Sequence, residues 1–93
     1  MVKATARHIL VKHIKIANKV KEEILSGTFT FEKAARKYSR CSSKKENGNL
    51  GTFCEGEMVK EFDNIVFKEE LNILHGPIKT RFGYHLIEIM HRD

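Results

Sequence analysis

The chain has 93 residues, of which 41% are hydrophobic and 31% are charged, and its net charge is +5. This length suits one small domain, over residues 1–93, with one modest core. No apolar stretch approaches the ~20 residues of a membrane-spanning helix, and the first residues lack the apolar segment of a signal peptide. We therefore expect a soluble, cytoplasmic monomer that has no membrane segment.

The first half of the chain predicts one strand and two helices. Residues 4–12 alternate in the manner of a strand, and residues 15–26 form a helix that Gly27 ends. The apolar stripe of that helix consists of Ile16, Ala17, Val20, Ile24 and Leu25. A second helix follows Thr30, which suits an N-cap, and its buried face consists of Phe31, Ala34, Ala35 and Tyr38. Residues 39–49 are polar and predict a loop or a broken short helix.

The second half of the chain predicts three strands and one helix. Residues 50–54 form a short strand, and an apolar stripe at residues 59–66 indicates a third helix. The single proline precedes a strand over residues 78–81, a Phe-Gly turn follows, and residues 84–90 form the last strand. We expect the last two strands to form a hairpin and the first strand to pair with the last. This order of elements makes an α+β domain.

Two histidines lie on the terminal strands, His8 on the first and His85 on the last. If these strands pair, the two side chains meet at the centre of the sheet. A single strand histidine is more often a hydrogen-bonded core residue than a ligand. No third ligand has the spacing of a metal site, and Cys41 and Cys54 lack CxxC spacing. We therefore expect no metal, and two reduced thiols.

Basic residues are dense in the middle of the chain, at Lys33, Arg36, Lys37, Arg40, Lys44 and Lys45, and again between residues 12 and 21. A basic face can attract nucleic acid or acidic proteins. Acidic residues are interleaved along much of the chain, and no alternation of aromatic and basic residues suits single-stranded bases. The pattern favours a solvated helical face, and nucleic acid remains the less favoured partner.

Several short motifs occur in order along the chain. They are His8-Ile9-Leu10-Val11, Cys41-Ser42-Ser43, the segment 47–53, Gly56-Glu57-Met58-Val59 with Phe62, Gly76-Pro77, and Phe82-Gly83-Tyr84-His85. With these motifs the chain resembles the parvulins, a family of peptidyl-prolyl cis/trans isomerases, over essentially its whole length. The resemblance implies a four-stranded antiparallel sheet surrounded by about four helices, in the order β-α-α-α-β-α-β-β.

The resemblance also implies a function and a site. The expected enzyme accelerates rotation about X–Pro bonds in unfolded or flexible polypeptides, without a cofactor, a metal or a covalent step. The implied substrate-binding residues are Leu50, Phe53, Met58, Phe62 and Phe82, and the implied catalytic residues are His8, Cys41, Thr80 and His85. In the family arrangement His8 and His85 contact each other and orient Cys41 and Thr80. From the sequence pattern alone, a phenylalanine in the position of Phe62 is more often an ordinary core residue of its helix than a substrate-binding residue.

Three features depart from the family pattern. Asn49 stands where the family often has Asp, and Lys60 stands where it often has Pro. The phosphate-directed branch carries a longer, arginine-bearing loop after the first strand, whereas residues 12–15 lead here almost directly into a helix. The resemblance therefore points to the branch that does not require phosphate. Because Lys12 directly follows the strand of His8, we expect a mild preference for acidic or neutral residues before proline.

Two other interpretations remain beside the isomerase. One is a peptide-holding chaperone module, and the other is a basic, nucleic-acid-binding domain of parvulin type. The complete polar centre favours the enzyme, because a pure binder has no need of it. We interpret Cys41 as a polar group that tunes the local field rather than as a nucleophile, since rotation needs no covalent step and the family often has Asp there.

Overall fold

The computed structural model describes residues 2–93 and contains four strands, three α-helices and one 3-10 helix. In chain order they are β1 Lys3–Val11, α1 Ile14–Leu25, α2 Phe31–Tyr38, η1 Ser42–Glu46, β2 Asn49–Cys54, α3 Lys60–Val66, β3 Leu74–Thr80 and β4 Gly83–Arg92. This order confirms the predicted α+β fold, and of the loop or broken short helix expected over residues 39–49, the structure contains the short helix η1. No helix within residues 2–93 is long and apolar enough to cross a membrane.

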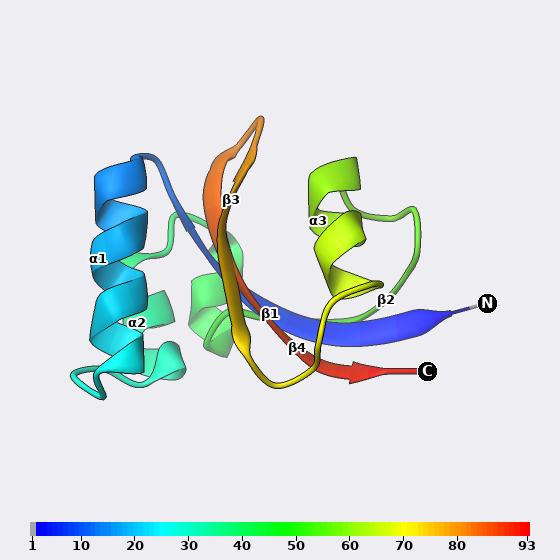
Figure 1. Cartoon of the computed structure of the whole chain (residues 1–93), viewed down its shortest axis with the longest axis horizontal. Coiled ribbons are helices and arrows are strands. Elements are labelled where there is room, and N and C mark those ends of the chain that lie inside the picture. Colours follow the sequence, from blue (N-terminus) through cyan, green and yellow to red (C-terminus); the bar gives the residue numbers. More distant parts are fainter. Residues whose placement is uncertain (1) are drawn as a thin grey trace.

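The four strands form one antiparallel sheet in the order β2-β1-β4-β3, so the two terminal strands of the chain lie at its centre (Figure 1). The predicted pairing of the first strand with the last is confirmed. Ile87 lies opposite His8, and His85 lies opposite Leu10. Because residues two apart along a strand share a face, both histidines project from the same face of the sheet at neighbouring positions.

An apolar core covers each face of the sheet. α1 and α2 pack on one face, where Ile9 and Leu86 are fully buried, and α3 packs on the other, where Ala6 and Ile87 are fully buried (Figure 1). The side chains of β1 thus alternate between the two cores, as the period of a strand requires. His8 shares its face with Ala6, so the two histidines lie on the side of the sheet that α3 covers.

Local signals in the sequence set two of the helix ends. The Thr30 hydroxyl accepts a hydrogen bond from the Lys33 N–H at 3.2 Å, which confirms the predicted N-cap of α2. Gly27 follows α1 with φ +83°, a left-handed conformation that glycine adopts without steric cost. Both helices therefore begin or end where the sequence predicts.

The apolar stripe of α1 is narrower than predicted. Ala17 and Val20 are buried and Ile24 packs against them, whereas Ile16 and Leu25 are 38% and 68% exposed. At about 100° per residue, Ala17, Val20 and Ile24 fall within a narrow sector of the helix surface. Ile16 and Leu25 flank this sector, one on either side. The helix therefore contacts the sheet along one line, and its flanking apolar residues reach solvent.

Strand β3 begins at Leu74, four residues earlier than the predicted start at residue 78. Proline has no N–H to donate to a neighbouring strand, which is why the sequence pattern placed Pro77 outside the strand. In the structure β3 is an edge strand, and its register with β4 shifts between His75 and Ile78. Proline is tolerated at such an edge irregularity, so the strand continues through it.

Candidate active site

An apolar cavity of about 240 Å³ lies between α3 and the central strands. Seven of the nine residues that the parvulin resemblance implied line it: His8, Cys41, Leu50, Met58, Phe62, Phe82 and His85. Leu10 and Val59 complete the lining. Sequence reasoning missed these two, although each is close in sequence to a predicted residue. The cavity is large enough to admit a small apolar side chain or ring.

Phe62 connects the apolar and polar parts of the cavity. It is 3% exposed, and its ring meets the rings of both His8 and His85 edge-on, with centroids 5.6 Å away in each case. Phe53 lies behind it, with ring centroids 6.2 Å apart and only 4% of its surface exposed. Phe53, which the resemblance implies as a substrate-binding residue, does not line the cavity and packs against Phe62.

The two histidines form a buried pair. The His8 Nδ1 and His85 Nδ1 atoms are 3.0 Å apart, and His85 Nε2 is 2.7 Å from the Thr80 hydroxyl oxygen. Thr80 is 5% exposed and does not line the cavity, so its contact is with His85. The contact between the histidines and the orientation of Thr80 are therefore as expected. Cys41 lines the cavity, but no hydrogen bond joins its thiol to either ring in residues 2–93.

The hydrogen bonds favour one arrangement of protons. Only one proton fits between the two Nδ1 atoms. If His85 donates that proton to His8, His85 Nε2 accepts from the Thr80 hydroxyl, which itself accepts from the Phe82 N–H at 3.2 Å. Among the polar side-chain atoms of His8, His85 and Thr80, the Nε2–H of His8 is then the one group that has no partner within residues 2–93. If His8 instead donates the shared proton to His85, both the Thr80 hydroxyl hydrogen and His8 Nε2 have no partner. This arrangement is therefore less favourable.

Both histidines are neutral at neutral pH. Burial, and to a lesser extent repulsion from His85, lowers the pKa of His8 to about 4. Burial likewise lowers the pKa of His85 to about 4, against the opposing effect of Glu61. The wall of the cavity therefore offers uncharged, oriented dipoles to whatever the cavity holds.

The polar segment before β2 positions this wall. Leu10 N–H donates to the Ser39 hydroxyl at 3.1 Å, Arg40 N–H donates to Leu10 C=O at 2.7 Å, and His8 N–H donates to Gly48 C=O at 2.9 Å. Residues 39–48 thus continue the pairing of β1 beyond the point where β2 diverges from it. The carbonyl of Gly48 and the hydroxyl of Ser39 hold the backbone on either side of the His8 side chain.

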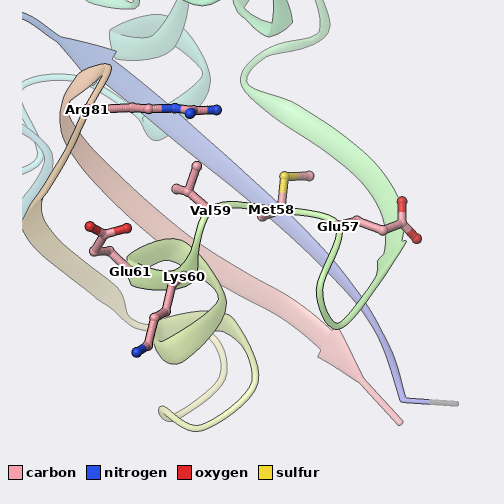
Figure 2. Close-up of a pocket in the computed structure, with 6 residues that line it drawn as sticks. All are labelled: Glu57, Met58, Val59, Lys60, Glu61 and Arg81. Carbon is pink, nitrogen blue, oxygen red and sulfur yellow. The ribbon is translucent and has the colours of Figure 1, made fainter.

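A second, more open cavity of about 430 Å³ adjoins the first, because Met58 and Val59 line both (Figure 2). In Figure 2 the Arg81 side chain extends from the β3–β4 turn toward these two residues, while Lys60 points away from it. Two acidic and two basic side chains share this surface. This surface therefore does not favour a ligand of one charge sign over the other. Within residues 2–93, no group of three or more His, Cys, Asp or Glu side chains is placed to hold a metal.

Comparison with known proteins identifies the family. The model of the PPIC-type PPIASE domain, called Rotamase, matches residues 4–91. The chain belongs to this family of peptidyl-prolyl isomerase domains. The PPIase domain is also 45% identical to Foldase protein PrsA 1 of Bacillus cereus over 85 residues, which are 90% of this chain and 29% of that protein. The chain spans about a third of the length of the curated relatives it matches.

Solved structures agree with this assignment. The solution structure of NmPin, the parvuline of Nitrosopumilus maritimus, is 40% identical, and the match covers 98% of each chain with a TM-score of 0.84. The crystal structure of PrsA from Bacillus anthracis is 30% identical with a TM-score of 0.93, over 99% of this chain and 42% of that one. The PPIase domain therefore has the parvulin fold that the resemblance implied.

Asn49 and Lys60, which depart from the family pattern, do not line the apolar cavity. The Asn49 side-chain oxygen accepts a hydrogen bond from the Gly51 N–H at 2.7 Å, which an aspartate would also accept. Lys60 is the first residue of α3, directly after the N-cap position. Neither change removes a residue from the cavity of this PPIase domain.

We predict that the stability of the domain falls as the pH decreases from 6.5 toward 4. The folded-state pKa of each buried histidine is about 4, below the ordinary 6.5, so the unfolded chain binds more protons in this range. The free energy of unfolding should fall by on the order of 1 kcal/mol per pH unit for each histidine, and this loss should level off below pH 4. Urea unfolding between pH 4.5 and 7.5 measures it.

Two variants test whether the buried histidines cause this pH dependence of stability. His85→Gln should show a shallower slope, because one buried titrating ring is gone, whereas His13→Gln, at an exposed position, should keep the wild-type slope. A wild-type free energy of unfolding that is flat over this pH range would contradict the neutral histidine pair.

Proposed function

We propose that the domain catalyses the cis/trans isomerisation of X–Pro peptide bonds by a non-covalent mechanism. The single observation that supports this most strongly is the apolar cavity of about 240 Å³ with a neutral histidine pair in its wall. The membership of the PPIase family agrees with it. The substrates we propose are unfolded or flexible proline-containing polypeptides, in keeping with the name foldase that several relatives carry.

The chemistry requires little from the protein. Rotation about the X–Pro bond has a barrier of about 18–20 kcal/mol, which arises from amide resonance. An acceleration of about 10³-fold requires only ~4 kcal/mol of additional stabilisation of the twisted amide. No bond is made or broken, so the site has only to bind the twisted form better than the planar one.

The residues divide this task between them. Phe62, Met58 and Leu50 hold the proline ring and exclude the water that stabilises the planar, more polar amide. The histidine pair presents fixed dipoles beside the bond, and because both rings are neutral, no proton needs to be transferred. Thr80 acts as a positioning residue, since it orients His85 from outside the cavity.

A refolding experiment separates this function from that of a peptide-holding chaperone. The substrate is a test protein whose slow refolding phase is limited by prolyl isomerisation. We expect the domain to accelerate the slow phase when it is present at one tenth of the substrate concentration or less. Acceleration that requires stoichiometric amounts, or retention of the unfolded chain without acceleration, would support the chaperone instead.

We predict that Cys41→Asp retains at least about a tenth of the wild-type kcat/KM. Cys41 lines the cavity without a hydrogen bond to either histidine, so the proposed role is to tune the local field, which a carboxylate also does. Exchange NMR on an X–Pro peptide measures the rate, with thermal melting to show that the variant is folded. A folded but wholly inactive Cys41→Asp would indicate a mechanism specific to the thiol.

The cytoplasmic location and the monomeric state stay predictions from the sequence.

A further inference from the structure

Met58 lies in a short connection, residues 55–59, between the end of β2 and the start of α3 (Figure 2). It lines both the apolar cavity and the more open cavity beside it, so its side chain stands in the wall between the two. Because the connection belongs to neither a strand nor a helix, other interactions have to hold Met58 in that wall.

The connection begins with a tight turn. The Glu57 N–H donates to the Cys54 carbonyl at 3.2 Å, and a side-chain oxygen of Glu57 accepts from the Cys54 N–H at 2.9 Å. Gly56, with φ +94°, is the third residue of this turn, and a Cβ there would meet nothing within 4 Å. Gly56 therefore faces open space on this side, where packing does not fix its position.

Asp63 ties the turn to α3. Its Oδ2 atom accepts a hydrogen bond from the Gly56 N–H at 2.6 Å. Asp63 itself is held in the helix, because its N–H donates to the Val59 carbonyl and its own carbonyl accepts from the Phe67 N–H, each at 3.0 Å. The preceding residue, Phe62, lines the apolar cavity. One helix therefore places Phe62 in the cavity and, through Asp63, holds the turn that leads to Met58.

Helix stability alone does not explain an aspartate at this position. The second oxygen of the Asp63 carboxyl group, Oδ1, is buried and has no hydrogen-bond partner within residues 2–93. A buried polar atom without a partner lowers stability, and alanine in the helix would avoid that cost. The first turn of α3 already contains Glu61, which supplies a negative charge at the helix N-terminus. The bond to Gly56 is therefore the distinctive contribution of Asp63.

We propose that Asp63 is a positioning residue that holds Met58 in the wall of the apolar cavity. The proposal rests on the proposed isomerase function and adds to it a residue that lines neither cavity. Asp63 fixes the Gly56 N–H and thereby the path of the next two residues, of which Met58 is the second. Without this bond the turn moves outward, and Met58 withdraws from the proline site.

Two substitutions of Asp63 separate the hydrogen bond from the charge. Asp63→Ala removes the acceptor, and we expect kcat/KM for an X–Pro peptide to fall by about tenfold, mostly through a higher KM. The reason is that the proline ring needs Met58 in both the planar and the twisted state, whereas the histidine pair is unchanged. Asp63→Asn keeps an oxygen acceptor and should stay within about threefold of wild type. An equal loss in both variants would assign the effect to the charge and overturn the proposal.

Thr30→Ala is the matched control. It also deletes a side-chain oxygen that accepts a backbone N–H, that of Lys33, but it does so in α2, on the other face of the sheet. It should lower the melting temperature and leave KM at the wild-type value. Exchange NMR gives kcat and KM, and thermal melting shows that each variant is folded under the assay conditions. A folded Asp63→Ala with the KM of wild type would overturn the proposal.

Methyl NMR tests the position of Met58 without any measurement of activity. The protein is isotope-labelled at the methionine methyl groups, and Met90, which is 40% exposed on β4, serves as the internal reference. In Asp63→Ala we expect the Met58 methyl signal to move toward that of an exposed methionine, while the Met90 signal stays in place. In Asp63→Asn both signals should remain near their wild-type positions.

These readouts keep the positioning role and the isomerase function distinct. If the wild-type domain accelerates no X–Pro peptide, the isomerase function fails, and with it any role of Asp63 in catalysis. If Asp63→Ala leaves the Met58 methyl signal at its wild-type position, the positioning role fails, whatever the activity is.

A double substitution completes the test. In a Met58→Ala background, Asp63→Ala should raise KM little further, because the side chain that Asp63 positions is already gone. An undiminished rise in KM in that background would show that Asp63 acts through another residue, which contradicts the proposal.

Discussion

Phe62→Ala is expected to lower kcat/KM for an X–Pro peptide by about a hundredfold, which corresponds to ~2.7 kcal/mol of transition-state binding. The Phe62 ring lines the apolar cavity and contacts both histidine rings edge-on, so its removal both widens the cavity and loosens the pair. Deleting a buried phenylalanine also costs about 3–5 kcal/mol of stability. Exchange NMR measures activity, and it is carried out well below the melting temperature of the variant.

Two companion variants separate activity from stability. Phe67→Ala removes a ring from the same apolar cluster, where it packs on Phe53 without lining the cavity. It should lower stability but keep most of the activity of the folded protein. Phe62→Leu preserves much of the apolar volume and should have an intermediate rate. A folded Phe62→Ala within threefold of wild type would show that the proline ring binds elsewhere.

Gly48→Ala is expected to destabilise the domain by roughly 3 kcal/mol and to reduce its activity. Gly48 has φ +86°, and a Cβ at this position would lie 2.6 Å from the backbone carbonyl oxygen of His8. The Gly48 carbonyl also accepts the His8 N–H, so a shift of this segment moves the histidine it supports. Urea unfolding measures the free-energy change, and exchange NMR measures the loss of activity.

Gly51→Ala provides the matched control. Gly51 also has a positive φ, of +74°, but a Cβ there would meet nothing within 4 Å. The substitution should therefore cost only the conformational penalty of about 1–2 kcal/mol for a side chain in this region. Equal destabilisation by Gly48→Ala and Gly51→Ala would show that the close approach to His8 is not what fixes glycine at position 48.

Sequence periodicity was enough to predict the frame of the site. The pairing of β1 with β4 followed from two apolar strands at the chain ends, and it places His8 next to His85. The N-cap at Thr30 carries its own local signal, a hydroxyl residue just before a helical apolar stripe. Such features depend on a few neighbouring residues, so they can be read before the fold is known.

Features that depend on packing between segments could not be read in this way. Phe53 and Phe62 are both aromatic residues that the resemblance placed in the substrate pocket, and only the structure shows that Phe53 lies behind Phe62. Likewise, the basic residues resembled an ordinary solvated helical face. In the structure Lys12, Arg40 and Lys44 converge on one cavity, because the end of β1 meets the segment after α2.

The most direct measurement for the proposed activity is exchange NMR on a short X–Pro peptide with tens of micromolar domain. Exchange between the cis and trans proline signals should accelerate equally in both directions, while their equilibrium ratio stays unchanged. Phe62→Ala, in its folded state, should largely remove this acceleration. If the folded wild-type domain produced no faster exchange than buffer alone, the apolar cavity and its histidine pair would not be an isomerase site.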